Sequence, residues 1–325
     1  MMQLAVIGIS AGAAAALLFA SVTSGVWLSV PLFYLAPLPI MIAGLGWSHW
    51  AALIASLAGA LALGTVFGVV FLFAFLAGAG VPAWWLGYLA MLARPVTAAG
   101  ANGQQQAALE WYPPGRLVVW AALLASLVVL VAIPNFGMDA ESFRAGLRGA
   151  LKTILHAEIG ATDGPLAVPG RIDRLIEFLV SAIPPAAAVL ATITNLFNLW
   201  LAARVVKFSG RLARPWPQLS SMSFPPLLTA ALALAIALSF IDGLVGIVAG
   251  VVSASLLLAY GLLGFAVLHA ITQGMQIRVF MLGLAYAAVF LIGWPMLALC
   301  VLGLIDAAFD LRGRIARRRG PPALS

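Results

Sequence analysis

Long apolar runs separated by short polar segments make up most of this chain of 325 residues. Segment 1–93 contains no Asp, Glu, Lys or Arg, and Asp242 is the only such residue in segment 225–276. A helix that crosses a bilayer needs about 20 predominantly apolar residues, so the pattern predicts a series of membrane-spanning segments. Their approximate bounds are 4–22, 30–46, 48–65, 66–92, 117–134, 181–203, 226–241, 243–272 and 279–305.

These runs are typical of helices rather than of barrel strands. Strands of a membrane barrel alternate apolar with polar residues, whereas segments 4–20 and 51–79 are apolar on every face. Composition agrees, because 64% of the residues are apolar and 8% are charged, against about 25% charged in an average soluble chain. We expect an all-α, polytopic transmembrane helical bundle, with a single membrane domain over 1–311 and a basic tail over 312–325.

The basic residues of the short loops predict the orientation, because cytoplasmic loops carry an excess of Lys and Arg. Segment 204–214 holds four cations and no acid, and the tail holds five arginines. We expect both on the cytoplasmic side of a bacterial inner membrane. Counting spans back from 204 then puts segment 139–177 outside, and segment 94–116 and the N-terminus inside.

Three apolar runs between 214 and the tail would leave the basic tail outside. We therefore expect about eight spans with one re-entrant or broken segment. Either segment 226–241 enters the membrane and returns, or Gly293-Trp294-Pro295 divides the last run into a hairpin. No charge marks a boundary within 47–91, and there Gly64 and Gly68 are the expected turn or kink.

Segment 134–183 is predicted to be an extracytoplasmic loop that contains an amphipathic helix. Asp139 is a suitable residue to cap the start of that helix. Apolar residues recur after it at helical spacing: Phe143, Leu147, Leu151 and Ile154. The helix is either a lid that lies on the membrane surface over a cavity or a simple connecting helix.

The motifs of several function classes do not occur in the sequence. There is no Walker loop, no His-Glu-x-x-His and no close pair of carboxylates within a span. The three histidines are far apart in the sequence, so a metal site would have few ligands. The single Cys300 excludes an intrachain disulfide. The basic residues that fix the orientation in the membrane explain the net charge of +7, so we expect no nucleic acid as a partner. We expect a non-enzymatic protein without a cofactor or metal.

Polar groups at membrane depth are the first candidates for function, because burying them is costly. Asn195 and Asn198 share one helix face and either bind a polar ligand or join two helices. Asp242, followed by Gly243, is either an intramembrane carboxylate or the polar corner of a turn. His269 has either a ligand or proton role or a place at the membrane interface.

Two segments are unusual in their proline or small-residue content. Three prolines in segment 31–39 predict a kinked or unwound stretch that lines a cavity, which makes Tyr34 a candidate ligand-binding residue. Gly8, Gly12 and Ala16 share one face of the first span, which lets a helix of this protein or of a partner approach closely.

Clustered cations are candidates for contacts with anionic lipid headgroups, although fixing the topology accounts for them as well. They are Arg204, Lys207, Arg211, Arg214, Arg317, Arg318 and Arg319.

Several segments together resemble the YybS-like family of bacterial membrane proteins, also described as domain of unknown function 2232. The similarity covers nearly the whole chain. The matching segments are Phe33–Pro39, Asn198–Gly210, Arg214–Pro217, Phe224–Pro225, Gly264–His269 and Asp306–Arg312.

The resemblance implies a fold loosely similar to the substrate-binding subunits of energy-coupling-factor vitamin transporters. It would then imply a cavity among the spans and a coupling subunit that contacts the small-residue face of the first span. The leading hypothesis is a transporter-subunit-like protein that binds a small or lipidic molecule in its bundle, with membrane lipids and other membrane subunits as partners. The alternatives are an assembly factor of the cell envelope and a lipid-modifying membrane enzyme.

Overall fold

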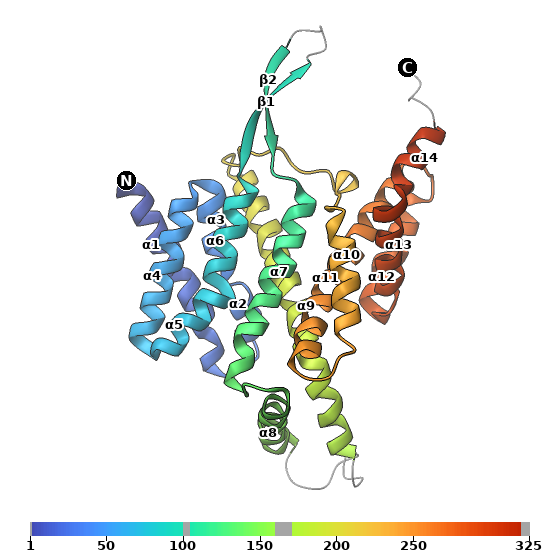
Figure 1. The fold of residues 1–325 in the computed structure, drawn as a ribbon. Coiled ribbons are helices and arrows are strands. Elements are labelled where there is room, and N and C mark those ends of the chain that lie inside the picture. The colour runs from blue at the N-terminus through green and yellow to red at the C-terminus, as the bar shows by residue number, and fades with distance from the viewer. Residues whose placement is uncertain (1, 100–104, 160–170, 320–325) are drawn as a thin grey trace.

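The structure, a computed structural model, describes residues 2–99, 105–159 and 171–319. Over these residues the chain forms a bundle of apolar helices with one projecting β-hairpin (Figure 1), which confirms the all-α class. The first elements are α1 (Met2–Ala20), η1 (Ser21–Ser24), α2 (Ser29–Tyr34), α3 (Pro37–Gly46), α4 (His49–Phe67), α5 (Val69–Phe75), η2 (Leu76–Gly80), α6 (Val81–Ala90), β1 (Ala93–Ala99), β2 (Gln105–Trp111), α7 (Pro114–Ala132) and η3 (Ile133–Asn135). The later elements are α8 (Ala140–Ile159), α9 (Arg171–Phe208), η4 (Leu219–Ser221), α10 (Leu227–Leu238), α11 (Leu244–Ile271), α12 (Arg278–Ile292), α13 (Pro295–Phe309) and α14 (Leu311–Arg319).

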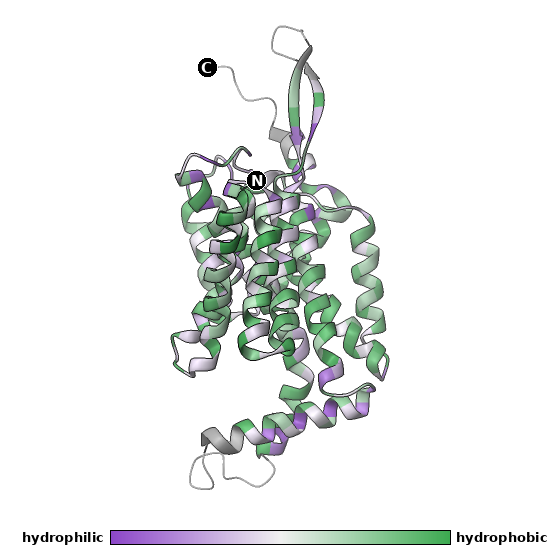
Figure 2. Ribbon diagram, turned by 90° about the vertical axis from the view of Figure 1, so that its left-hand side faces the viewer, coloured by the Kyte–Doolittle hydropathy of each residue, from purple (hydrophilic) through white to green (hydrophobic). Residues whose placement is uncertain are grey.

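Hydrophobic residues predominate along the helices of the bundle, whereas hydrophilic residues gather toward its two ends (Figure 2). Seven helical segments of the described chain are long and apolar enough to cross a membrane, and α10, α12 and α13 are shorter apolar helices. Large apolar side chains on several of these helices, including Leu61, Val70, Leu227 and Phe290, are between 61% and 89% exposed. Soluble proteins rarely expose apolar surface on this scale. The chain is therefore a multi-pass membrane protein.

The polar elements gather at the two ends of the bundle. The start of α1, the β-hairpin, the segment after α9 and the helix α14 all lie at one end, here called the hairpin end (Figure 1). The helix α8 lies at the other end, here called the α8 end, and runs across the bundle rather than along it (Figure 2). The N-terminus, segments 94–116 and 204–214 and the tail, all predicted on the cytoplasmic side, thus share the hairpin end. Segment 139–177, predicted on the other side, begins at the α8 end.

Two glycines with positive φ divide the longest apolar runs. Gly68, with φ of 93°, ends α4 and reverses the chain into α5, at one of the two positions that the sequence indicates. Gly293, with φ of 80°, separates α12 from α13, which pack against each other as a hairpin. The last run is therefore divided into two helices, whereas α10, of 12 residues, is a shorter apolar helix. After α12 and α13 the chain is back at the hairpin end, where α14 lies (Figure 1).

The helix α9 is longer than the sequence predicts. It begins at Arg171 rather than near 181 and continues to Phe208 through Pro184 and Pro185. At 1.5 Å per residue its length is about 57 Å, which exceeds the roughly 30 Å of a hydrocarbon core. Its first turns consequently extend past the bundle, where they pack against α8.

A two-stranded antiparallel hairpin stands where the sequence analysis expects only a loop over 94–116. Its register pairs Ala93 with Trp111 and Ala99 with Gln105. At its base the amide of Tyr112 donates to the carbonyl of Leu92 across 2.9 Å. The strands are short and do not alternate apolar with polar residues, so the pattern alone did not reveal them. The sequence Asn102-Gly103 between them is a recognised hairpin signal.

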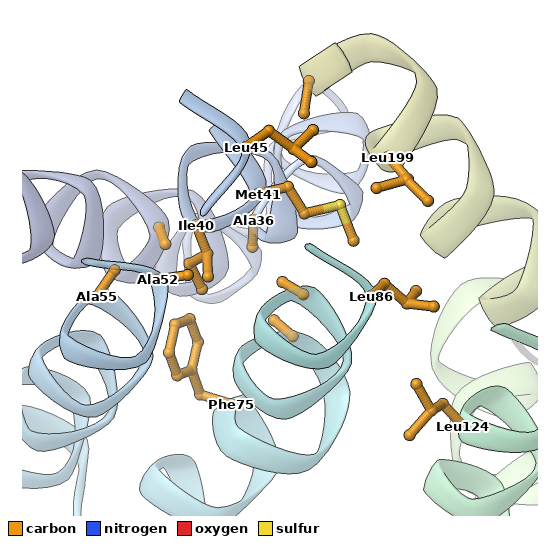
Figure 3. Packing of buried hydrophobic residues seen from close by; sticks show 14 of the residues in the cluster. Ala36, Ile40, Met41, Leu45, Ala52, Ala55, Phe75, Leu86, Leu124 and Leu199 are labelled. Carbon is orange, nitrogen blue, oxygen red and sulfur yellow. The ribbon is translucent and has the colours of Figure 1, made fainter. Parts of the chain in front are cut away.

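The largest hydrophobic core lies among α1, α3, α4, α6, α7 and α9 (Figure 3). Ile40, Met41, Phe75 and Leu86 are fully buried within it. A second cluster surrounds Tyr260 between α7, α10 and α11. A third lies between α8, the first turns of α9 and the start of α11, and this third cluster positions the candidate site.

Candidate functional site

A cavity of about 280 Å³ lies at the α8 end, between α8, the middle of α9, the turn from α10 to α11, and the start of α11. Four charged or hydroxyl residues contribute to its lining: Arg144, Ser181, Ser239 and Asp242. The rest of the lining is apolar or glycine, and includes Phe143, Val180, Pro184, Pro185, Gly246 and Ile247. It is here called the α8 cavity.

The start of α8 is fixed by its N-cap. Asp139 accepts hydrogen bonds through Oδ1 from the amides of Glu141 (3.0 Å) and Ser142 (2.9 Å). The Ser142 hydroxyl donates to Asp139 Oδ2 across 2.7 Å. These bonds favour the carboxylate, and the bond from the Ser142 amide is the main cause of a pKa of Asp139 below its usual value of 3.8. The predicted N-cap is therefore present.

The body of α8 is held against α9 by apolar contacts and ion pairs. Phe143, Leu147 and Leu151 are buried with Ile176 and Val180 of α9. Ile154, which shares the same spacing, is 57% exposed and does not join them. Two ion pairs lie alongside, between Arg148 and Glu177 and between Lys152 and Asp173. The predicted amphipathic helix thus packs on the α8 end and supplies Phe143 and Arg144 to the cavity.

Glycine and proline shape the other walls. Pro184 and Pro185 line the cavity and have no backbone N–H. The stretch of α9 that faces the cavity therefore lacks two amide donors. Gly243 has φ of 95° in the turn before α11. One turn later, a Cβ on Gly246 would lie 1.9 Å from the carbonyl oxygen of Ile241, so only glycine fits there.

The α8 cavity combines one cation and one anion with a lining of apolar residues, glycines and two serines. Arg144 and Asp242 are both exposed and reach it from different elements. The hydroxyls of Ser181 and Ser239 donate to backbone carbonyls of their own segments, at 2.8 Å and 2.7 Å. This arrangement suits a small group that carries both charges, attached to an apolar body.

Among the predicted candidates, Asp242 is placed in this cavity. It lies in the turn between α10 and α11 and is exposed, which corresponds to the polar corner of a turn. His269 lies in the last turn of α11, at the hairpin end. Its Nδ1 is 2.9 Å from the carbonyl oxygen of Phe265, and its ring meets the edge of Tyr286 in α12. The fold therefore separates these two residues.

The proline-rich segment is broken as predicted, with α2 ending at Tyr34 and α3 beginning at Pro37. The amide of Leu38 bonds to the carbonyl of Leu35 across 3.0 Å. In a continuous helix that amide would bond to the carbonyl of Tyr34 instead. The break therefore leaves the Tyr34 carbonyl without a partner on its own segment.

Asn198 of α9 supplies that partner. Its Nδ2 donates to the carbonyl oxygens of Tyr34 and Thr194, both at 2.8 Å. The side chain is fully buried, and its Oδ1 has no hydrogen-bond partner among the described residues. Asn195 is also buried, with 3% exposure. The geometry of Asn198 corresponds to the helix-joining interpretation.

The small-residue face of α1 is used within the chain. Gly8, Gly12 and Ala16 are buried, and α1 packs closely on α4. A Cβ on Gly8 would lie 2.9 Å from the carbonyl oxygen of Ala51 in α4. Of the two partners considered for this face, a helix of the same protein is the one in contact with it.

The basic residues of segment 204–214 have two different environments. Arg204, Lys207 and Arg211 are exposed at the hairpin end. Arg214 is 9% exposed and donates to the carbonyls of Ala90 (2.8 Å) and Tyr112 (2.7 Å). Burial lowers the pKa of Arg214. Its guanidinium binds the end of α6 and the base of the hairpin, and is not available to a headgroup.

The tail is helical through α14. Arg317 pairs with Asp310 at 3.6 Å, whereas the side chains of Arg318 and Arg319 lie outside the described ones. Asp306, 4% exposed, pairs with Arg312 at 2.7 Å, and Arg312 also donates to the carbonyl of Ser220 across 2.8 Å. This latch between α13, α14 and the segment after α9 was not among the expected sites.

Arg144 was also missed, because it is one of several cations on an amphipathic helix and the pattern does not distinguish it from the solvated ones. Within the described parts of the chain, no three metal-ligating side chains group together. In the comparisons with known proteins, the chain matches no family model, no curated protein and no solved structure.

Proposed function

We propose that this multi-pass membrane protein binds an amphiphilic molecule whose small zwitterionic or polar head occupies the α8 cavity. The observation that carries the proposal is the joint contribution of Arg144 and Asp242 to one cavity with apolar walls. A guanidinium forms strong hydrogen bonds with a phosphate or carboxylate, and a carboxylate with an ammonium. One group of each sign therefore selects a head that carries both.

The position of the α8 cavity supports a lipidic ligand. Phe240 and Ile241, which line it, are 84% and 51% exposed and continue the apolar surface of the bundle. A ligand could keep its apolar part against that surface, in lipid, while its head lies beneath α8. A volume of about 280 Å³ is near the lower limit for small-molecule sites and suits a head rather than a whole lipid.

The helix α8 would then act as a lid over the bound head. Its own side chains complete the cavity, and its amphipathic character suits a membrane surface. This agrees with the lid interpretation of segment 134–183. We also propose a transporter-subunit-like role, in which a separate protein supplies the energy. Membership of the YybS-like family is a proposal as well.

Charge distribution supports a bacterial inner membrane with the hairpin end in the cytoplasm. Twelve of the 17 lysines and arginines belong to segments at that end: Arg94, Arg116, Arg204, Lys207, Arg211, Arg214, Arg278, Arg312, Arg314, Arg317, Arg318 and Arg319. The α8 end would then face outward, so the ligand would bind from the outer leaflet.

Native mass spectrometry of the protein purified in mild detergent tests the proposal. We expect the wild type to retain a small amphiphile, and the variants Arg144→Gln and Asp242→Asn each to retain at least several-fold less. Lys152→Gln is the matched control, because it removes a cation of α8 that does not line the cavity.

Equal retention by the wild type and by both cavity variants would contradict the proposal. A wild type that carries no small molecule but a stoichiometric protein partner would favour the assembly factor instead. The folded yield of each variant, measured by size-exclusion chromatography, separates lost binding from lost structure.

A further inference from the structure

Three cations at the hairpin end have no carboxylate partner among the described residues. Arg204 and Lys207 lie in the last turns of α9, and Arg211 follows that helix. All three are exposed, and none takes part in an ion pair of the described structure. Their positive charge is therefore available to an external anion.

The acidic residues at this end are already engaged. Three acids of the described residues belong to segments at the hairpin end. Each pairs with its own arginine: Glu110 with Arg94, Asp306 with Arg312, and Asp310 with Arg317. No acid lies in the sequence between Glu177 and Asp242, the segment that holds the three free cations.

Tryptophans hold these cations in place. The guanidinium carbon of Arg204 is 5.1 Å from the ring centre of Trp216, and Lys207 Nζ is 5.0 Å from the same centre. Arg211 lies 4.7 Å above the ring of Trp47. Contacts of this kind attract a cation without neutralising it. Arg204 and Lys207 are thus held on one indole with their charges intact.

The position of Trp216 is itself fixed by a buried contact. Arg214, two residues earlier, is anchored by its hydrogen bonds to the carbonyls of Ala90 and Tyr112. The segment that carries Trp216 is therefore attached to α6 and to the base of the hairpin, which preorganises the cations for binding.

A shallow, open groove lies beside them, lined by four neighbouring residues of α9: Arg204, Val205, Lys207 and Phe208. Phe208 is 98% exposed, and Val205 is 43% exposed. The groove thus combines two cations with exposed apolar side chains at the end of a membrane helix. Tryptophans near it, including Trp200 and Trp216, are typical of the interface between hydrocarbon and headgroups.

We propose that Arg204, Lys207 and Trp216 form a binding site for the phosphate of an anionic phospholipid, whose acyl chains lie along Val205 and Phe208. The site is separate from the α8 cavity and lies at the opposite end of the bundle. Its charge selects anionic over zwitterionic lipids, because two cations meet one phosphate and no carboxylate is present to bind an ammonium group.

Native mass spectrometry of delipidated protein, titrated with phosphatidylglycerol or phosphatidylcholine, tests this site. The wild type should bind phosphatidylglycerol more tightly than phosphatidylcholine. The double variant Arg204→Gln with Lys207→Gln should bind it about 30-fold more weakly. The matched control is Arg278→Gln with Arg314→Gln, which removes the same charge at the same end and should bind as the wild type does.

Equal binding of both lipids by the wild type would overturn the proposal, whether or not the variants fold. An equal loss in the control pair would also overturn it, because general surface charge would then explain the preference. An excess of inorganic phosphate should leave phosphatidylglycerol bound. Complete displacement by phosphate would indicate a site for free anions rather than for a lipid.

Discussion

A methyl group on Gly12 of α1 would lie 2.5 Å from the backbone carbonyl oxygen of Ala55 in α4. The two helices are therefore in backbone contact, and the small residues of α1 permit that contact. Because α4 fills this face within the chain, a separate coupling subunit would have to contact the protein elsewhere.

Gly12→Ala should lower the stability of the bundle by about 1–3 kcal/mol, because the added carbon forces α1 and α4 apart. Thermal unfolding in detergent would measure the change. Gly87→Ala in α6 is the control, since nothing lies within 4 Å of the position of its Cβ. Similar melting temperatures for the two variants would show that the close contact is not required.

Asn198→Ala should destabilise the protein by about 1 kcal/mol, the scale of interhelical hydrogen bonds in membranes. The substitution leaves the Tyr34 carbonyl without its donor. Thermal unfolding measures the loss, and retention of the amphiphile per folded molecule should stay unchanged. A variant of normal stability that loses the amphiphile would assign Asn198 to a binding site instead.

Helix breaks could be predicted where glycine stands within an apolar run that is too long for a single span. Gly68 and Gly293 both stand where the sequence indicates a turn, and both adopt positive φ. The start of α9 could not be predicted in this way. Its first turns are amphipathic rather than uniformly apolar, so a search for apolar runs leaves them out, although they are helical and pack against α8.

Asp139→Ala should loosen the start of α8, because the amides of Glu141 and Ser142 lose their acceptor. Amide hydrogen exchange over α8 should become faster. The lowered pKa of Asp139 has a second consequence in the wild type. Its stabilising effect is present above the usual value of 3.8 and is lost as the pH falls through the lower folded value.

Asp139→Asn is the control for this pH dependence, since Asn also caps helices but does not ionise in this range. Its exchange should be slow, and it should change less between pH 5 and acid than that of the wild type. If acid accelerates exchange over α8 equally in both proteins, Asp139 is not the responsible group.

Cysteine labelling tests the arrangement of the ends. Replacing Cys300 by Ala removes the only native thiol, which is buried. In that background, Thr97→Cys in β1 should label from the same side of the membrane as Arg317→Cys in α14. Thr153→Cys in α8 should label from the opposite side. Labelling of Thr153→Cys and Thr97→Cys from one side would contradict the bundle as described.

The candidate site was only partly visible in the sequence. Asp242 could be selected because a lone acid in an apolar region is unusual. Arg144 and Ser181 lie in segments of ordinary amphipathic composition, and only the fold brings them to Asp242. Asn198 was visible for the same reason as Asp242, but its partner is a backbone carbonyl freed by a helix break, which side-chain patterns do not reveal.

The most direct test of ligand binding at the α8 cavity is protection of Ser181→Cys from a thiol reagent in the Cys300→Ala background. Position 181 lines the cavity and is exposed. Lipid extracted from the membrane of origin and added to delipidated protein should slow labelling of Ser181→Cys but not of Thr153→Cys. If the extract leaves the labelling rate at position 181 unchanged, the cavity does not bind an amphiphile and the proposed function is wrong.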